Sequence, residues 1–121
     1  MNDINKIKLI VLDCDGVLTD GKITYDNNQL ELKSFSAHDG LGVKILSFSD
    51  IKVAVVTGRE SQCLAKRCDD LKITLLYQAI SNKRKTIENI LTELNLEWEN
   101  VAYMGDDWND WPAMKKSGLK T

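Results

Sequence analysis

The chain has 121 residues, 43% of them hydrophobic and 28% charged, which is the composition of one globular domain able to bury a core. Its 16 basic and 18 acidic residues leave a net charge of −2, so we expect neither nucleic acid nor an anionic membrane as a partner. No apolar run is long enough to cross a bilayer, and the first residues lack the apolar core of a secretion signal, which predicts a cytoplasmic protein.

Four short apolar runs predict strands that are buried on both faces of a sheet. These strands are expected at residues 8–13, 53–57, 73–77 and 101–104. Helices are expected at residues 40–48, from after Gly58 to about 69, at 83–94 and at about 111–118. Because strands and helices alternate, the predicted fold is a single α/β domain over residues 1–121, with a Rossmann-like parallel sheet flanked by helices.

The segment between the first two strands predicts a β-hairpin over about residues 22–35. Its arms, residues 23–25 and 30–35, flank the turn sequence Asp26-Asn27-Asn28-Gln29, whose asparagines tolerate positive φ. The hairpin is too short to be a domain, so we interpret it as a flap.

Several further expectations concern packing. Asp39 is expected to cap a mostly buried helix over residues 40–48, and Ser81 to cap the helix over residues 83–94. The three cysteines have no metal-ligand spacing, and Cys14 is expected to fill the core. Trp108 and Trp111 are expected to be packing residues, with a subunit interface as the alternative.

Reactive side chains follow three of the predicted strands. Asp13 and Asp15 follow the first, Thr57-Gly58-Arg59 the second, and Gly105-Asp106-Asp107 the fourth, while Lys83 begins the helix after the third. In a parallel sheet these positions share one edge, which is where ligands bind. Carboxylates brought together there need a cation, and a hard divalent metal with a phosphate satisfies them.

This set of residue types fits phosphoryl transfer. One carboxylate, Asp13, can attack phosphorus, and a second, Asp15, can protonate the leaving oxygen and then activate water. Thr57 and Lys83 can hold the phosphoryl oxygens, and Asp106 can bind Mg²⁺. Lys83 is preferred over Lys85 by its spacing, and Asp107 and Asp110 are expected to orient the groups around the metal rather than bind it.

The motifs Asp-x-Asp-Gly-Val-Leu-Thr, Val-Thr-Gly-Arg, Ser-Asn-Lys and Gly-Asp-Asp-x-x-Asp occur in this order along nearly the whole chain. In this the chain resembles the haloacid dehalogenase (HAD) superfamily of phosphatases. With no room for a cap domain, it is similar to the capless branch, and within it to phosphatases of 3-deoxy-D-manno-octulosonate 8-phosphate (KDO 8-phosphate). The fragments Lys33-Ser34-Phe35 and His38-Asp39-Gly40-Leu41-Gly42 support the narrower resemblance.

The resemblance implies an Mg²⁺-dependent phosphatase in lipopolysaccharide precursor synthesis, acting on a phosphorylated sugar acid as a homotetramer. It implies that Mg²⁺ is bound by the side chains of Asp13 and Asp106 and by the backbone carbonyl of Asp15. It also implies substrate contacts from Ser36, Ala37, His38, Asp39, Gly40, Lys44, Arg59, Arg67 and Lys83. From the residues alone, Arg59 and Arg67 fit a substrate contact and a surface ion pair equally well.

Two departures from the family pattern stand out. His38 occupies a position where the family usually has arginine. The chain ends at Thr121, before the further strand, glycine-rich segment and final helix of the family, so we expect a shortened form that lacks the C-terminal part of the fold.

Three alternative functions share features with this sequence. A phosphatase for a nine-carbon, sialic-acid-type 9-phosphate, such as KDN or N-acylneuraminate 9-phosphate, stays open because few residues determine specificity. A phospho-accepting receiver domain is disfavoured, because its acidic pair follows the first strand and its phosphorylated aspartate the third. A shortened, non-catalytic assembly module is the remaining possibility.

Overall fold

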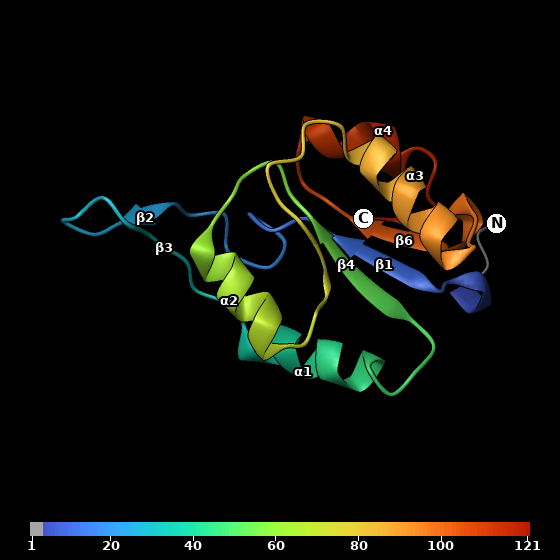
Figure 1. Cartoon of the computed structure of the whole chain (residues 1–121), viewed down its shortest axis with the longest axis horizontal. Coiled ribbons are helices and arrows are strands. Elements are labelled where there is room, and N and C mark those ends of the chain that lie inside the picture. Colours follow the sequence, from blue (N-terminus) through green and yellow to red (C-terminus); the bar gives the residue numbers. More distant parts are fainter. Residues whose placement is uncertain (1–3) are drawn as a thin grey trace.

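A parallel five-stranded sheet forms the centre of the computed structural model, which describes residues 4–121 (Figure 1). The strand order is β5-β4-β1-β6-β7. The strands are β1 (Leu9–Leu12), β4 (Lys52–Val56), β5 (Leu75–Tyr77), β6 (Val101–Met104) and β7 (Leu119–Lys120). Because β1 pairs with both β4 and β6, the carboxyl ends of these three strands lie next to one another.

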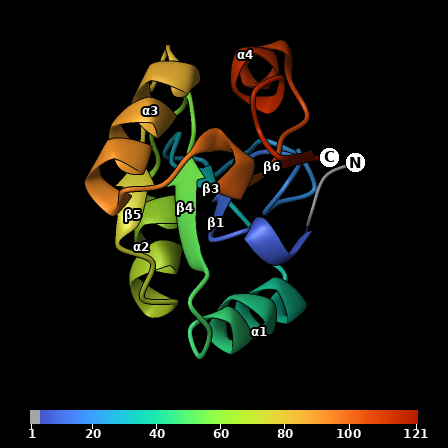
Figure 2. The same ribbon diagram turned by 90° about the vertical axis from the view of Figure 1, so that its right-hand side faces the viewer.

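Helices cover both faces of the sheet (Figures 1 and 2). The helices α1 (Ala37–Leu46) and α2 (Gln62–Asp70) lie on one face, and α3 (Lys83–Leu94) and α4 (Trp111–Met114) on the other. Short 3₁₀ turns occur at η1 (Ile4–Lys6), η2 (Trp98–Asn100) and η3 (Trp108–Asp110). The predicted α/β fold with a helix-flanked parallel sheet is therefore confirmed.

Two hydrophobic cores result from the alternation of side chains along the strands. Val11 and Val56 belong to the core under α3, together with Ile87. Val55 belongs to the core under α2, where Cys14 is only 1% exposed and confirms its predicted role as a core residue. Both faces of the central strands are thus buried, as their apolar sequences predict.

The hairpin is confirmed, although its strands are shorter than predicted. The antiparallel strands β2 (Thr24–Tyr25) and β3 (Glu31–Leu32) project away from the sheet (Figure 1). The side chain of Asp26 accepts hydrogen bonds from the backbone amides of Asn28 and Leu30 and fixes the turn. Within the described residues, this hairpin is the only regular structure between β1 and α1.

Some packing expectations were wrong. Ser36, rather than Asp39, caps α1, and Asn82, rather than Ser81, caps α3, because their side chains accept the first backbone amides. Within α1, only Gly40 is buried. Apolar side chains of the helix, and that of Phe48 just beyond its end, are exposed to solvent. The difference arises because the hydrophobic residues of this helix are spread around its circumference and do not form a single buried stripe.

The last segment also differs from expectation. The edge strand β7, which was not predicted, pairs in parallel with β6 and is the fifth strand of the sheet. Trp108 and Trp111 do not pack in the core, since they are 88% and 54% exposed. Among the described residues, no helix is sufficiently long and apolar to cross a membrane.

Candidate active site

A cavity of about 320 Å³ lies at the carboxyl ends of the central strands. It brings together the residues that the sequence predicted for catalysis and metal binding. The residues lining it are Asp13, Asp15, Gly21, Thr57, Gly58, Arg59, Lys83, Asp106, Asp107 and Asn109. Side chains from four separate segments of the chain therefore converge on one small polar space.

Asp13 lines this cavity directly after β1 and is 6% exposed. Its Oδ1 accepts a hydrogen bond of 2.7 Å from the Cys14 amide and lies 3.3 Å from the Lys83 Nζ. Burial raises the pKa of the Asp13 carboxyl, although Lys83 and the amide partly oppose this effect. The other oxygen, Oδ2, has no such partner among the described residues and is available to a ligand.

Lys83 is held in place by a fully buried carboxylate, Asp110. The Lys83 ammonium lies 2.6 Å from Asp110 Oδ1, which also accepts a hydrogen bond from the Tyr103 hydroxyl. Asp110 Oδ2 accepts hydrogen bonds of 3.1 Å from the backbone amides of Asp106 and Asp107. Burial alone would raise the pKa of Asp110, but the hydrogen bonds from Lys83 and Tyr103 outweigh it and lower that pKa.

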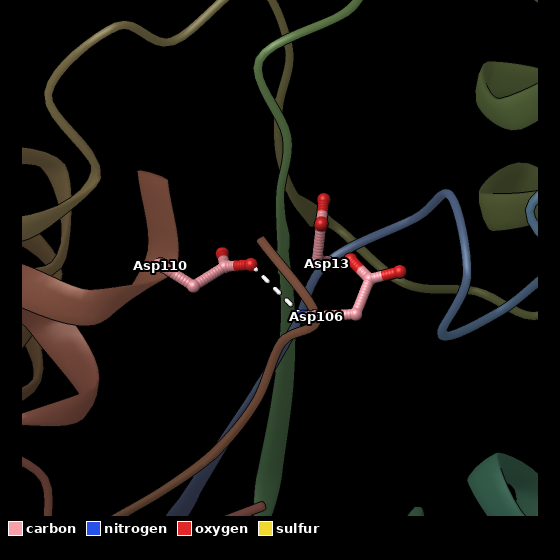
Figure 3. Close-up of side chains that lie close together, drawn as sticks. All are labelled: Asp13, Asp106 and Asp110. Atoms are coloured by element: carbon pink, nitrogen blue, oxygen red, sulfur yellow. Dashed lines mark hydrogen bonds between the residues drawn. The ribbon is translucent and has the colours of Figure 1, made fainter. Parts of the chain in front are cut away.

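Three carboxylates, Asp13, Asp106 and Asp110, place oxygen atoms within 4.8 Å of one another (Figure 3). Asp110 lies on the other side of the Asp106 backbone from the Asp106 carboxyl group, and it accepts a hydrogen bond from the Asp106 backbone amide (Figure 3). Each of the two Asp110 carboxylate oxygens already accepts two hydrogen bonds, so Asp110 is poorly suited to bind an ion. Within residues 4–121, neither Asp13 Oδ2 nor the Asp106 carboxylate has a hydrogen-bond or ion-pair partner, and this donor set fits a hard divalent cation.

Gly16 provides the space in which the Asp106 side chain lies. A Cβ atom added at Gly16 would be 1.7 Å from Asp106 Oδ2, and the Gly16 φ of +83° also favours glycine. The turn after β1 thus allows the Asp106 carboxylate to approach the backbone closely, beside Asp13.

The sequence reasoning missed two residues of the site, Lys33 and Glu31. The Lys33 Nζ lies 2.7 Å from Asp15 Oδ1 and 2.6 Å from Glu31 Oε1. Arg59 forms a 2.8 Å ion pair with Glu31 and also lines the cavity. Lys33 stands in a motif fragment that pointed to the family, but nothing in its spacing indicated that it reaches Asp15.

The other residues implied as substrate contacts do not line this cavity in a single chain. They are Ser36, Ala37, His38, Asp39, Gly40, Lys44 and Arg67. Arg67 donates to the Ser36 carbonyl at 3.0 Å and lies over the Phe35 ring, so it holds the start of α1. Lys44 lines a different groove, of about 750 Å³, at the amino ends of β4 and β5.

Lys85 is exposed, whereas Lys83 is only 3% exposed and reaches the cavity, in agreement with the preference for Lys83 from spacing. Thr57 is buried at the end of β4, and its Oγ1 accepts a long hydrogen bond of 3.4 Å from the Arg59 amide. Asp107 caps η3 through a hydrogen bond from the Trp108 amide. These positions agree with the predicted site, and the role of each residue stays a prediction.

Known proteins resemble this chain along nearly its whole length. The 3-deoxy-D-manno-octulosonate 8-phosphate phosphatase KdsC of Escherichia coli strain K12 is 50% identical over 113 residues, which are 93% of this chain and 60% of that protein. The crystal structure of the phosphatase of the same name from Yersinia pestis has a TM-score of 0.92 and 44% identity, and the match covers 95% of this chain and 62% of the other.

A third relative carries ligands. It is the 3-deoxy-D-manno-octulosonate 8-phosphate phosphatase from Moraxella catarrhalis in complex with magnesium, phosphate and KDO, with a TM-score of 0.90, 36% identity and coverage of 93% of this chain and 65% of that one. The chain thus spans less than two thirds of the length of these relatives. The family model of the haloacid dehalogenase-like hydrolases matches residues 25–121. With its strand-end aspartates in one cavity and this match over most of its length, the chain belongs to the haloacid dehalogenase-like hydrolases.

Proposed function

We propose that the chain carries the catalytic residues of an Mg²⁺-dependent phosphatase that hydrolyses KDO 8-phosphate to KDO and inorganic phosphate. The observation that carries this proposal is the convergence of Asp13, Asp15, Thr57, Lys83 and Asp106 on one cavity. The relatives named as phosphatases of this substrate support it, as does the relative that holds magnesium, phosphate and KDO.

In the first step of the proposed reaction, Asp13 Oδ2 attacks phosphorus. The bond from phosphorus to the sugar oxygen breaks, and Asp15 donates its proton to that oxygen, which releases KDO. The Thr57 hydroxyl and the Lys83 ammonium hold the phosphoryl oxygens as charge develops on them. Asp110 and Tyr103 keep Lys83 in this position.

In the second step, the aspartyl-phosphate is hydrolysed. Asp15, now a carboxylate, takes a proton from a water molecule, and the water oxygen attacks phosphorus. The bond between phosphorus and Asp13 breaks, which restores the Asp13 carboxylate and releases inorganic phosphate.

The side chains of Asp13 and Asp106, with the backbone carbonyl of Asp15, would hold Mg²⁺. When bound, the ion offsets the repulsion between the Asp13 carboxylate and the anionic phosphate. Asp107 and Asp110 would orient these ligands, since Asp110 binds the backbone amide of Asp106.

A homotetramer in the cytoplasm would complete the site. The implied substrate contacts Ser36, Ala37, His38, Asp39, Gly40, Lys44 and Arg67 do not line the cavity of their own chain. Residues of this group could therefore act only from a second copy or after a rearrangement, whereas Arg59 already lines the cavity. A capless site of this kind needs a neighbour to exclude water.

Release of phosphate from KDO 8-phosphate, with and without Mg²⁺, tests the proposal. We expect Asp13→Asn to abolish turnover while its circular dichroism spectrum stays that of the wild type. Asp50→Asn is the matched control, because Asp50 lies in the separate groove at the other end of the sheet and should leave turnover unchanged. An Asp13→Asn protein with most of its activity would contradict the assignment of the nucleophile.

The same assay with N-acylneuraminate 9-phosphate separates the eight-carbon from the nine-carbon substrate. If the protein hydrolysed only the nine-carbon phosphate, that compound would replace KDO 8-phosphate as the proposed substrate. No phosphate release from any substrate, by a folded protein, would favour a non-catalytic assembly module.

A further inference from the structure

Four charged side chains of alternating sign stand in a row beside the cavity. Asp15 Oδ1 lies 2.7 Å from the Lys33 Nζ, Lys33 lies 2.6 Å from Glu31, and Glu31 lies 2.8 Å from Arg59. The Arg59 Nε lies 3.9 Å from Asp15 Oδ2, which closes the row into a ring. The ring joins the turn after β1, the β3 arm of the hairpin and the loop after β4.

Lys33 is the most buried member of this ring. Its side chain is 2% exposed, compared with 23% for Asp15, 18% for Glu31 and 38% for Arg59. A lysine so buried is stable as a cation only beside negative partners. Asp15 at 2.7 Å and Glu31 at 2.6 Å are these partners, so the ring supplies the negative charge that the buried ammonium needs.

The contact between Lys33 and Asp15 distinguishes the two oxygens of the carboxyl. An ammonium group has only donors, so the oxygen that it contacts, Oδ1, must act as an acceptor. Because the hydroxyl oxygen of a carboxylic acid is the weaker acceptor, a proton carried by Asp15 is more stable on Oδ2, away from Lys33. The Arg59 Nε is too distant, at 3.9 Å, to occupy Oδ2 in the same way.

We propose that Lys33 is a positioning residue that holds Asp15 Oδ1 and thereby directs the proton-carrying Oδ2 to the leaving oxygen. Glu31 in turn fixes Lys33 and Arg59, so the hairpin orients the acid that protonates the leaving group. This inference rests on the proposed phosphatase function and assigns to the hairpin a role within its own chain.

The sensitivity of the reaction to the leaving group tests this proposal. Phenyl phosphates with different para substituents have leaving oxygens of different basicity, and none of them makes the contacts of a sugar. A nitrophenolate leaves without a proton, whereas a phenolate depends more on the acid. The quantity to measure is kcat/KM, because it covers only the steps up to release of the leaving group.

We expect Lys33→Met to lower kcat/KM for phenyl phosphate about tenfold more than for p-nitrophenyl phosphate, within the range that general acids contribute. Lys33→Arg should recover a large part of the loss because it retains the charge. In an Asp15→Asn background, adding Lys33→Met should cost no further activity on phenyl phosphate. The control Lys66→Met removes an ion pair of similar length, 2.6 Å to Asp70, on the exposed surface of α2. It should leave kcat/KM unchanged for both substrates.

Equal losses on both substrates, or no loss, would overturn the proposal, because a merely structural role does not depend on the leaving group. If Lys33→Met does not fold, the charge-balanced double substitution Glu31→Gln/Lys33→Met is measured in the same way, and equal losses there would also overturn it. Failure of the proposed function looks different: the wild type would not release phosphate from KDO 8-phosphate, whereas the comparison of aryl phosphates concerns Lys33 alone.

Discussion

Replacement of Gly16 by alanine should separate the stability of the fold from the binding of the metal. At a φ of +83°, an alanine side chain costs roughly 1–2 kcal/mol. The smaller conformational freedom of the unfolded chain returns about 0.4–1 kcal/mol. The free energy of unfolding should therefore fall by about 1 kcal/mol, equivalent to a decrease in Tm of about 4 °C for a chain of this size.

The effect on Asp106 should be larger than the effect on stability. The new Cβ would lie 1.7 Å from Asp106 Oδ2, so that carboxylate must rotate away from its position beside Asp13. Because Asp106 is exposed, the rotation costs little stability. A misplaced carboxylate should nevertheless raise the Mg²⁺ concentration for half-maximal activity by about tenfold or more, the size of effect seen when groups that orient metal ligands are lost.

Gly21→Ala is the matched control for this substitution. Gly21 has almost the same φ, +86°, and although it also lines the cavity, its new Cβ would come no closer than 3.7 Å to any atom outside its two chain neighbours and would not touch Asp106. Both variants should lose about the same stability in urea unfolding, and only Gly16→Ala should need more Mg²⁺. A folded Gly16→Ala protein with the wild-type Mg²⁺ requirement would refute the reasoning that Gly16 makes room for Asp106.

The remaining predictions concern buried groups. Asp110 has a lowered pKa, so its contribution to stability is complete above its unfolded value of 3.8 and is lost as the pH falls through the lower pKa of the folded state; Asp110→Asn should remove this part of the acid dependence in urea unfolding measured against pH. The same variant should lower the free energy of unfolding at pH 7 by about 3–5 kcal/mol, because the buried Lys83 loses its 2.6 Å partner and keeps only Asp13 at 3.3 Å, and a loss below 1 kcal/mol would contradict this. Tyr103→Phe should cost about 1–2 kcal/mol, since only a hydrogen bond to Asp110 is lost, and an unchanged Tm would argue against that bond. Burial raises the pKa of the Cys14 thiol to about 12 and of the Cys68 thiol to about 11, so in the native protein at pH 8 only Cys63 should react rapidly with a thiol reagent; rapid reaction of a second thiol would show that the core under α2, which holds both buried thiols, opens.

Much of the fold could be predicted because its signals are local. The run Leu9–Leu12 is apolar without interruption, which is typical of a central parallel strand, and it lies between β4 and β6. The spacing of Ile87, Ile90 and Leu91 similarly marked the buried face of α3. By contrast, β7 has only two residues, and such a short strand is defined by its pairing with β6 rather than by its sequence.

Errors arose where several residues compete for one position. Ser36 and Asp39 can both cap a helix, and the path of the chain after the hairpin decides for Ser36. The apolar residues of α1, such as Leu41 and Ile45, suggested burial, yet only an arrangement of neighbouring elements can bury them, and in this chain they are more than half exposed. Hydrophobicity alone therefore predicted a helix but not its environment.

The sequence by itself determined which reactive side chains share one edge of the sheet. Asp13, Asp15, Thr57, Lys83 and Asp106 stand at strand ends or at the start of a helix, and a parallel sheet necessarily gathers those positions at one edge. Only the tertiary structure decided how the charges are paired. It placed Asp110 against Lys83 and Tyr103 rather than toward an ion, and it brought Lys33 from the hairpin to Asp15 across 18 positions of sequence. Such pairings depend on distances and burial that are set by packing between segments, and no local pattern records them.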